Sequence, residues 1–555
     1  MVNFRVRACL ITYGVLNAVL YASLLPLWEG FDEPFHYAYV ESLAREHALP
    51  LLGKAQLPPD VWASVHAAPA SQVVQHNLPW VVTFGDYFRM SRGERARIRT
   101  LLENPPLRGY GPGGLNYEAQ QAPLAYVVLA LVEYPWRFAG LMMRVWLLRL
   151  FCGVFAVVTT AVFLLLLARR LRIPQVYEDP LVFVVLSLQM FYATTAHIAN
   201  DWLAVPLMIV LFERLVALRE SPTLRNVILL ASAAGAGLLT KAYFLALLPV
   251  LMGVLAELTV RRRLHWRGIV FFGLIILLGC GPWYLRNLRL YKSLSGMQQT
   301  VGGNDWIGLA GALRRVPWWH SLKDLSSASI WTGNNSGGTF SSVTIAMLTG
   351  GFALAAVLYA AGLIKRRGLP VSEAVVACGC AAYGAALVYS TAVGFWATRG
   401  VAVSPCPWYT QPIIPIALLL LFCGLARIGR AGAVTAVWLV WWSAYVISAT
   451  YWAKLIPLYA GYPHPGKTVL PQLLRWYRGL PAIADTLSIA AMTDSRFILG
   501  SAAVVAVGAL TLATGFSLVL LRTAASTPPA RSDGKPAPDL KALAGEVPAR
   551  APLNG

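Results

Sequence analysis

The stretch VRACLITYGVLNAVLYASLLPLWEGFDEPFHYAYV (residues 6–40) decides the fold class, because an apolar run leads directly into an acidic and aromatic segment. Residues 6–27 are apolar over about the length that a helix needs to cross a bilayer. Arg5 and Arg7 stand at the start of this run, as in a signal peptide. The run is long and lacks a clean cleavage site of small residues, so we expect an uncleaved first span.

The rest of the chain repeats the apolar pattern. Of the 555 residues, 57% are hydrophobic and 13% are charged, whereas a soluble domain has about 25% charged residues. In lipid, backbone polar groups must be satisfied within the segment, which favours helices. The sequence therefore predicts an all-α polytopic membrane protein with about twelve spans. These lie near residues 6–27, 145–168, 180–198, 202–218, 224–240, 243–259, 268–285, 343–364, 371–392, 408–425, 432–452 and 497–521.

Short basic connections set the expected orientation. They lie at 168–172, 218–225, 261–267, 365–367 and 426–430. The positive-inside rule places these connections, and both termini, in the cytoplasm. Residues 122–141 are apolar enough to span, but a span there would move every later basic connection outside. We therefore expect an in-plane or re-entrant helix at the outer face.

This topology divides the chain into a transmembrane domain and a tail. The domain covers residues 1–522 and sends loops 28–144, 286–342, 393–407 and 453–496 to the extracytoplasmic side. The large first loop, 28–144, holds eleven of the 25 acidic residues. Residues 523–555 are rich in Pro and Ala, which predicts a disordered cytoplasmic tail.

Charge and cysteine content argue against a nucleic-acid-binding protein and against a fold held by disulfides or a cysteine metal site. The net charge is +21, but the basic residues flank spans or lie in loops, and no soluble basic face for nucleic acid is visible. The seven cysteines are scattered, nearly all inside apolar runs, and imply no disulfide framework. Cys378 and Cys380 are two apart in a span and would face different sides, so they do not indicate a metal site.

Two adjacent carboxylates follow the first span. Asp32 and Glu33 lie among aromatic residues, where a partly apolar setting raises a carboxyl pKa towards that of a general base. An ordinary helix start, with Asp32 as N-cap and Pro34 in the first turn, explains the same residues. His36 follows on the face of Asp32. It either orients that carboxylate, shares a metal ion with it, or is a plain interfacial histidine.

Polar turns and cations mark other outer span ends. The block from Asn116 to Gln121, with Tyr117 and Gln120, precedes the in-plane helix, and its amide and phenol donors suit sugar or phosphate oxygens. Asn200 and Asp201 form a turn between two spans. A helix cap and a polar hairpin are the structural alternatives for these two groups.

The cations at the outer face oppose the positive-inside tendency and call for an anionic partner, for which a lipid phosphate is the natural candidate. Lys241 stands alone between apolar helices, where snorkelling to headgroups is the alternative. Arg286, Arg289 and Lys292 leave the end of a span among Trp and Tyr, and the aromatic belt explains the Trp and Tyr but not three cations on the outer side. Arg399 and Tyr409 form a weaker group further along the chain.

These pieces, in this order, resemble the GT-C superfamily of polyprenyl-phosphate-dependent glycosyltransferases, which includes protein O-mannosyltransferases and the lipid A aminoarabinose transferase. The matching motifs are FDEPFHYAYV, QQAPLAYVVLA, NDWLA, GLLTKAYF and GPWYLRNLRLY, and they cover roughly residues 1–295. WYTQPIIPIALLLL is similar to a late segment of the family. Two departures are Gln121-Ala122-Pro123, where a Pro-Pro pair is common, and Trp408 before Tyr409, where an Arg is common.

The resemblance implies an inverting transfer of a sugar from a polyprenyl-phosphate donor to a glycan, lipid or protein acceptor, outside the plasma membrane of a bacterium. It implies Asp32 as the general base with Glu33 second, and Lys241, Arg286 and Asn287 as ligands of the donor phosphate. Substrate contacts would come from His36, Tyr117, Gln120, Asn200, Asp201, Arg399 and Tyr409. No metal site is assigned, although Asp32, Glu33, His36 and Asp201 could ligate a divalent ion. A transporter or flippase of a lipid-linked sugar, and a non-catalytic polysaccharide-assembly protein, are the alternatives.

Overall fold

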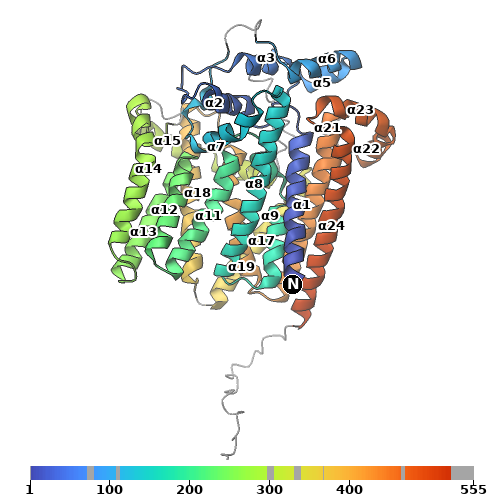
Figure 1. The fold of residues 1–555 in the computed structure, drawn as a ribbon. Helices are drawn as coiled ribbons and strands as arrows, with labels where there is room; N and C mark the ends of the chain where they lie inside the picture. The colour runs from blue at the N-terminus through green and yellow to red at the C-terminus, as the bar shows by residue number, and fades with distance from the viewer. Residues whose placement is uncertain are drawn as a thin grey trace, which may run out of the picture.

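Long helices stand side by side as a bundle in the computed structural model of the chain, and shorter helices cover one end of it (Figure 1). The structure describes residues 2–71, 80–107, 113–296, 306–330, 339–366, 368–463 and 469–526. The regular elements within these ranges are helices, which confirms the predicted all-α polytopic class.

Eight helices among the described residues are long and apolar enough to cross a membrane. They are α1 (Val2–Leu24), α8 (Leu141–Arg170), η3 with α13 (Ala242–Leu247 and Leu248–Val260), α14 (Arg267–Tyr291), α17 (Ser342–Arg366), α18 (Val371–Ala397), α20 (Arg430–Ala449) with η7 (Thr450–Leu455) and α21 (Ile456–Tyr459), and α24 (Ser495–Ser526).

The other four predicted spans are also helical, but they are shorter, bent or more charged. Helices α9 (Gln175–Val185) and α10 (Gln189–Thr195) meet at an angle of 61° and together correspond to one predicted span. Helix α11 (Asp201–Glu220) carries several charged residues, while α12 (Leu224–Leu238) and α19 (Ile414–Leu425) are short apolar helices. Each predicted span therefore corresponds to a helix or a helix pair.

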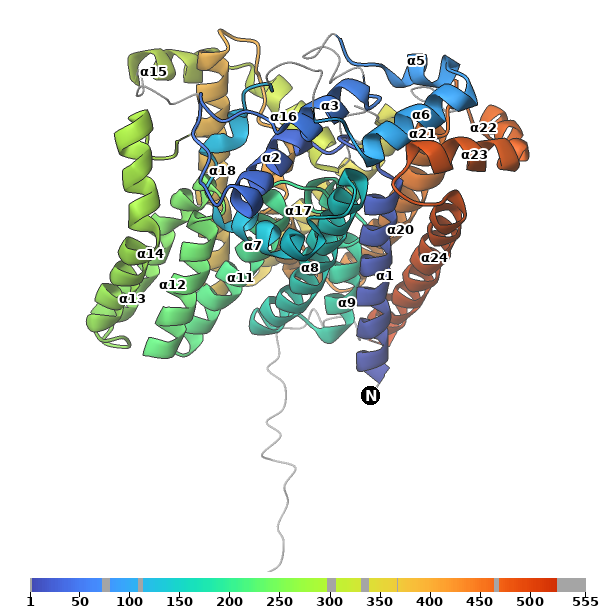
Figure 2. The same cartoon turned by 45° about the horizontal axis from the view of Figure 1, so that its top comes forward.

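The first loop forms most of the layer that covers one end of the bundle (Figure 2). Its helices are α2 (Glu33–Arg45), α3 (Pro59–Ala67), α5 (Phe84–Arg89), α6 (Arg92–Glu103), η1 (Tyr117–Gln120), α7 (Leu124–Glu133) and η2 (Tyr134–Trp136). Helix α7 packs beneath α2, and with η2 it is too short to cross a bilayer. This agrees with the expectation that residues 122–141 do not form a span.

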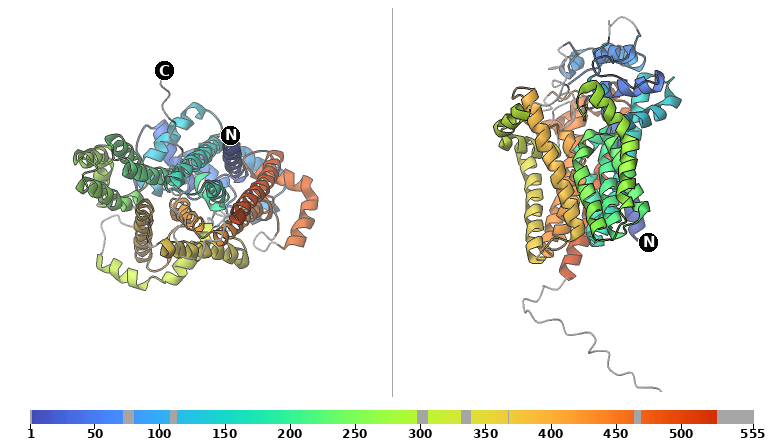
Figure 3. Two further views of the ribbon diagram at one scale, coloured as in Figure 1. Left: turned by 90° about the horizontal axis from the view of Figure 1, so that it is seen from below. Right: turned by 90° about the vertical axis from the view of Figure 1, so that its left-hand side faces the viewer.

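Later loops add to the same layer. They contribute α15 (Trp306–Arg315), α16 (Trp318–Ile330), η6 (Pro407–Thr410), α22 (Leu470–Trp476), η8 (Tyr477–Gly479) and α23 (Leu480–Ala490). The N-terminal end of α1 and the end of α24 lie at the opposite end of the bundle (Figure 3). Helix α24 includes residues 523–526 of the predicted tail, and the rest of that tail lies outside the described residues.

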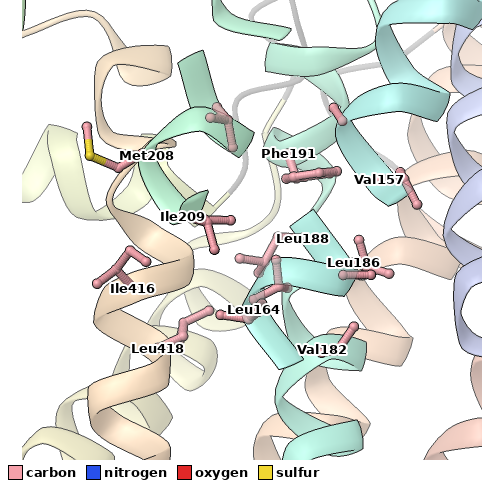
Figure 4. Packing of buried hydrophobic residues seen from close by; sticks show 14 of the residues in the cluster. Val157, Leu164, Val182, Leu186, Leu188, Phe191, Met208, Ile209, Ile416 and Leu418 are labelled. Carbon is pink, nitrogen blue, oxygen red and sulfur yellow. The ribbon is translucent and has the colours of Figure 1, made fainter. Parts of the chain in front are cut away.

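The bundle core is apolar and closely packed (Figure 4). Leu164 of α8, Leu186 and Leu188 at the bend after α9, Ile209 of α11 and Leu418 of α19 meet in it. Lipid tails are as apolar as these side chains, so close packing rather than escape from water holds membrane helices together. Small residues permit the closest approaches. A Cβ on Gly424 of α19 would lie 2.4 Å from the Cα of Tyr359 in α17.

We expect Gly424→Ala to destabilise the protein by about 1–3 kcal/mol, because the added methyl forces α17 and α19 apart. Gly350→Ala in α17 is the matched control, since a Cβ there meets nothing within 4 Å and alanine favours the helix. Thermal unfolding of the purified proteins in detergent measures both. Equal midpoints for the two variants would show that the α17–α19 contact adapts without cost.

Candidate functional site

Asp32 lies at the junction between the first span and α2, and its carboxylate does not cap that helix. Its backbone is left-handed, with φ of +54°, and Tyr117 Oη donates a hydrogen bond to Asp32 Oδ1 at 2.5 Å. Burial raises the pKa of Asp32, and the nearby Asp201 adds to this, while Tyr117 and Lys241 oppose it. The N-cap alternative is therefore wrong for the side chain, and the carboxylate belongs to a polar cluster.

Glu33 has a different environment although it is the next residue. The guanidinium of Arg149 in α8 forms a fork with both of its oxygens, and neither side chain is exposed. Burial is the largest influence and favours the protonated form, but the charge and hydrogen bonds of Arg149, with smaller contributions from His197 and the Ile198 amide, together outweigh it and lower the pKa of Glu33. Arg149 also donates to the carbonyls of Leu25 and Pro26, at 2.6 Å and 2.9 Å. Glu33 thus anchors α2 to α8, and its covered carboxylate is not accessible to an acceptor as the second candidate base.

Lys241 does not stand alone in space. Its Nζ lies 2.5 Å from Asp201 Oδ2, and both side chains are buried. Tyr243 Oη donates to the other oxygen of Asp201 at 3.4 Å, and the Lys241 ammonium lies 5.0 Å from the ring centroid of Tyr409. The compensating anion is therefore a carboxylate forty residues earlier, rather than a lipid phosphate as the sequence alone indicated.

A chain of amides joins Asn200 to the polar block of the first loop. Asn200 Nδ2 donates to Gln121 Oε1 at 3.0 Å, and Gln121 Nε2 donates to Glu118 Oε2 at 2.8 Å. The contacts hold η1 against the start of α11. Segments near residues 32, 117, 200 and 241, which are far apart in the sequence, therefore converge in the structure.

His36 belongs to this cluster through Tyr126 and Glu118 rather than through Asp32. Its Nδ1 lies 2.7 Å from Tyr126 Oη and 3.9 Å from Glu118 Oε2. Burial, with the charges of His197 and Lys241, lowers the pKa of His36 well below its usual range. The neutral ring serves as a hydrogen-bonding partner inside the cluster.

Glu118 is the residue that the sequence analysis passed over. It is buried, and burial together with the charge of Asp32 raises its pKa to about 8, against the hydrogen bond from Gln121 and the charge of Lys241. Near neutral pH this carboxyl therefore keeps its proton. Its position inside the block Asn116–Gln121 was visible in the sequence, but its proximity to Asp32 and Asp201 was not.

A cavity of about 690 Å³ adjoins the cluster. Its polar wall is formed by Gln120, Gln121, Lys241, Lys292, Ser293, Ser295 and Tyr409. Its apolar wall runs along η3, α13 and α18, with Leu245, Ala246, Pro249, Ala382, Ala385, Ala386 and Leu387. One cavity thus joins a charged head region to an apolar channel between spans.

Arg286 and Asn287 lie beside this cavity without lining it, contrary to their expected role in binding phosphate. Arg286 donates to the carbonyl of Pro50 at 3.1 Å and lies 4.7 Å from the Trp283 ring centroid. Asn287 is buried, and its Nδ2 donates to the carbonyl of Leu294 at 3.5 Å. These side chains fasten the end of α14 to the first loop and to the turn that follows it.

The late pair separates in the structure. Tyr409 lines the cavity, and its carbonyl accepts a hydrogen bond from Tyr383 Oη at 2.6 Å. Arg399 is exposed after the end of α18 and does not line the cavity, so it does not take the place of an arginine before Tyr409.

The residues named as a conceivable cation site do not converge on a common point. Across the described part of the chain, no three His, Cys, Asp or Glu side chains form a group that could hold a metal ion. Glu33 forms an ion pair with Arg149, and Asp201 forms an ion pair with Lys241. The cluster is thus organised by hydrogen bonds and one internal ion pair.

Comparison with known proteins returns one structural match. No family model matches the chain, and no curated protein matches it. The fold is similar to a solved structure described as ArnT from Cupriavidus metallidurans bound to undecaprenyl phosphate, over 83% of this chain and 74% of that chain. The sequences are 17% identical and the TM-score is 0.39.

We expect Glu118→Gln to change how stability depends on pH. An unfolded Glu titrates near 4.5, whereas the folded protein holds this proton up to about 8. Between these values the unfolded chain binds fewer protons, so the contribution of Glu118 to stability falls as pH rises. Glutamine does not titrate, and the stability of the variant relative to wild type should rise across this window. Thermal unfolding of both proteins over this pH range measures the difference, and a constant difference would contradict the assigned titration.

Proposed function

We propose that this protein is a membrane glycosyltransferase that transfers a sugar from a polyprenyl-phosphate donor to an acceptor on the extracytoplasmic face. The observation that carries the proposal is the cavity, in which a wall with two lysines continues into an apolar channel between α13, α14 and α18. An amphiphile with an anionic head and a long apolar tail would place its head at the lysines and its tail in the apolar channel. The motifs that resemble GT-C enzymes contribute Asp32, Lys241 and Tyr409 to the same region.

The reaction is a displacement at the anomeric carbon of the donor sugar. The acceptor hydroxyl oxygen forms a bond to that carbon, and the bond from the carbon to the phosphate oxygen breaks, with the electron pair leaving on the phosphate. Asp32 takes the hydroxyl proton, and its raised pKa makes it a stronger base than an ordinary aspartate. Phosphate is a good leaving group, so no general acid is required. Attack from the opposite face inverts the configuration.

Sidedness supports an extracytoplasmic reaction. The cluster lies under the layer of short helices, while the basic connections at 168–172, 218–225, 261–267 and 426–430 lie at the other end with the N-terminal end of α1 (Figure 1). The positive-inside rule places that other end in the cytoplasm. A transporter would instead concentrate charges near the middle of the spans.

The product is found first, by comparing lipid and glycan extracts of a deletion strain with those of its parent. We expect a glycan or lipid that lacks one sugar in the deletion strain. Restoration of this sugar by the wild-type chain then becomes the assay. An unchanged composition of both extracts, under conditions in which the parent strain produces the protein, would count against the transferase.

Asp32→Asn should lower transfer by about 10²- to 10⁴-fold, the usual contribution of a general base. The asparagine oxygen still accepts the Tyr117 hydrogen bond, so the fold is retained. Asp86→Asn in the exposed part of α5 is the matched control and should transfer normally. Complementation of the deletion strain, with membrane levels of each protein measured in parallel, reports the result. Full transfer by Asp32→Asn would remove Asp32 from the mechanism.

A further inference from the structure

The polar cluster around Lys241 has more carboxylates than cations, which is unfavourable for binding an anionic donor there. Asp32, Asp201 and Glu118 lie close to Lys241, which is the positively charged group that pairs with Asp201. Even with Glu118 protonated, two carboxylates face one ammonium. A phosphate at Lys241 would therefore compete with Asp201 and be repelled by Asp32, so the donor needs a cation elsewhere on the cavity wall.

Lys292 meets this need. It ends α14 with a left-handed backbone, φ of +56°, and its side chain lines the cavity and is exposed. Its ammonium forms no ion pair with any acidic residue in the described ranges. Ser293 and Ser295 line the same wall, with their hydroxyl oxygens 3.3 Å apart.

The turn after α14 is held in place from behind. The buried Asn287 donates to the carbonyl of Leu294. Gly296 has φ of +71° and approaches Asn287 so closely that a Cβ would lie 3.0 Å from its Nδ2. The backbone amide of Leu52 donates to Tyr291 Oη at 3.2 Å, which ties the end of α14 to the first loop. The residues predicted to bind phosphate, Arg286 and Asn287, thus support the turn that presents Lys292.

We propose that Lys292, with Ser293 and Ser295, forms the binding site for the phosphate of the lipid-linked donor, while Lys241 remains paired with Asp201. This inference rests on the proposed function. A lysine ammonium binds phosphate as a point charge, and serine hydroxyls donate to phosphate oxygens. The apolar wall of α13 and α18 then receives the hydrocarbon tail, and the sugar lies towards Asp32.

The inference is tested by binding of two probes, a polyprenyl monophosphate and the polyprenol of the same length, to the full-length protein in detergent. We expect the wild-type protein to bind the phosphate more tightly than the alcohol. Lys292→Gln should bind the phosphate roughly tenfold more weakly and the alcohol unchanged, which is the range for a hydrogen bond to a charged group. Arg289→Gln, three residues earlier on the exposed surface of α14 and outside the cavity lining, is the matched control and should bind both probes like wild type.

The outcomes separate the two proposals. If the wild-type protein binds both probes equally, it does not recognise the phosphate, and the proposed function as a polyprenyl-phosphate-dependent transferase is contradicted. If it prefers the phosphate and Lys292→Gln keeps the full preference, the phosphate site lies elsewhere and only the present inference fails. A lysine at a helix C-terminus also stabilises the helix through its dipole. A purely structural role would lower the thermal midpoint of Lys292→Gln and leave its ratio of phosphate to alcohol binding unchanged.

Discussion

The ion pair between Glu33 and Arg149 fixes the position on which the whole site depends. Both side chains are completely covered, and the guanidinium also satisfies two carbonyls at the end of the first span. Removing one partner from such a pair leaves a buried charge without compensation, which is strongly destabilising. The start of α2, and with it the carboxylate of Asp32, is thereby held against α8.

A second arginine of α8 secures the rest of α2. Arg144 contacts Glu41 of α2, lies 2.9 Å from Glu133 at the end of α7, and lies 3.3 Å from Asp60 of α3. Three helices of the first loop are thus attached through a single side chain of the span. The layer over the bundle is built on α8, and four of the eleven acidic residues of the first loop are used for this attachment.

Much of the fold was predictable, because span length and hydropathy follow directly from the thickness of the bilayer. Each of the twelve predicted spans is helical, and residues 122–141 do not cross. The pairing of charges was not predictable to the same degree. Arg149 lies inside an apolar run, and nothing local indicates that Glu33, 116 residues earlier, is its partner. Lys241 and Asp201, forty residues apart, likewise become visible as a pair only in the folded chain, where α12 packs against both α11 and η3.

The site residues were likewise predictable where residue type and position along the chain decided their role, and not where the direction of a side chain in the fold decided it. Asp32, Asn200 and Tyr409 were singled out by residue type and by their place at an outer span end. Tyr117 was singled out by its place before the in-plane helix, and all four converge. Arg286 was singled out by the same criteria and Asn287 by the family resemblance, and both instead support the end of α14 and the turn after it. The sequence shows that a cation lies near the membrane face, whereas only the direction of its side chain shows whether it meets the cavity or the protein.

The alanines of α18 give the apolar channel a particular breadth. Ala382, Ala385 and Ala386 leave room where larger side chains would narrow the passage, and Ala246 faces the same space. An isoprenoid chain is wider than a straight fatty acyl chain, because every unit bears a methyl branch. The methyl branches of the proposed polyprenyl donor would lie beside these alanines, whereas bulkier side chains at the same positions would exclude them.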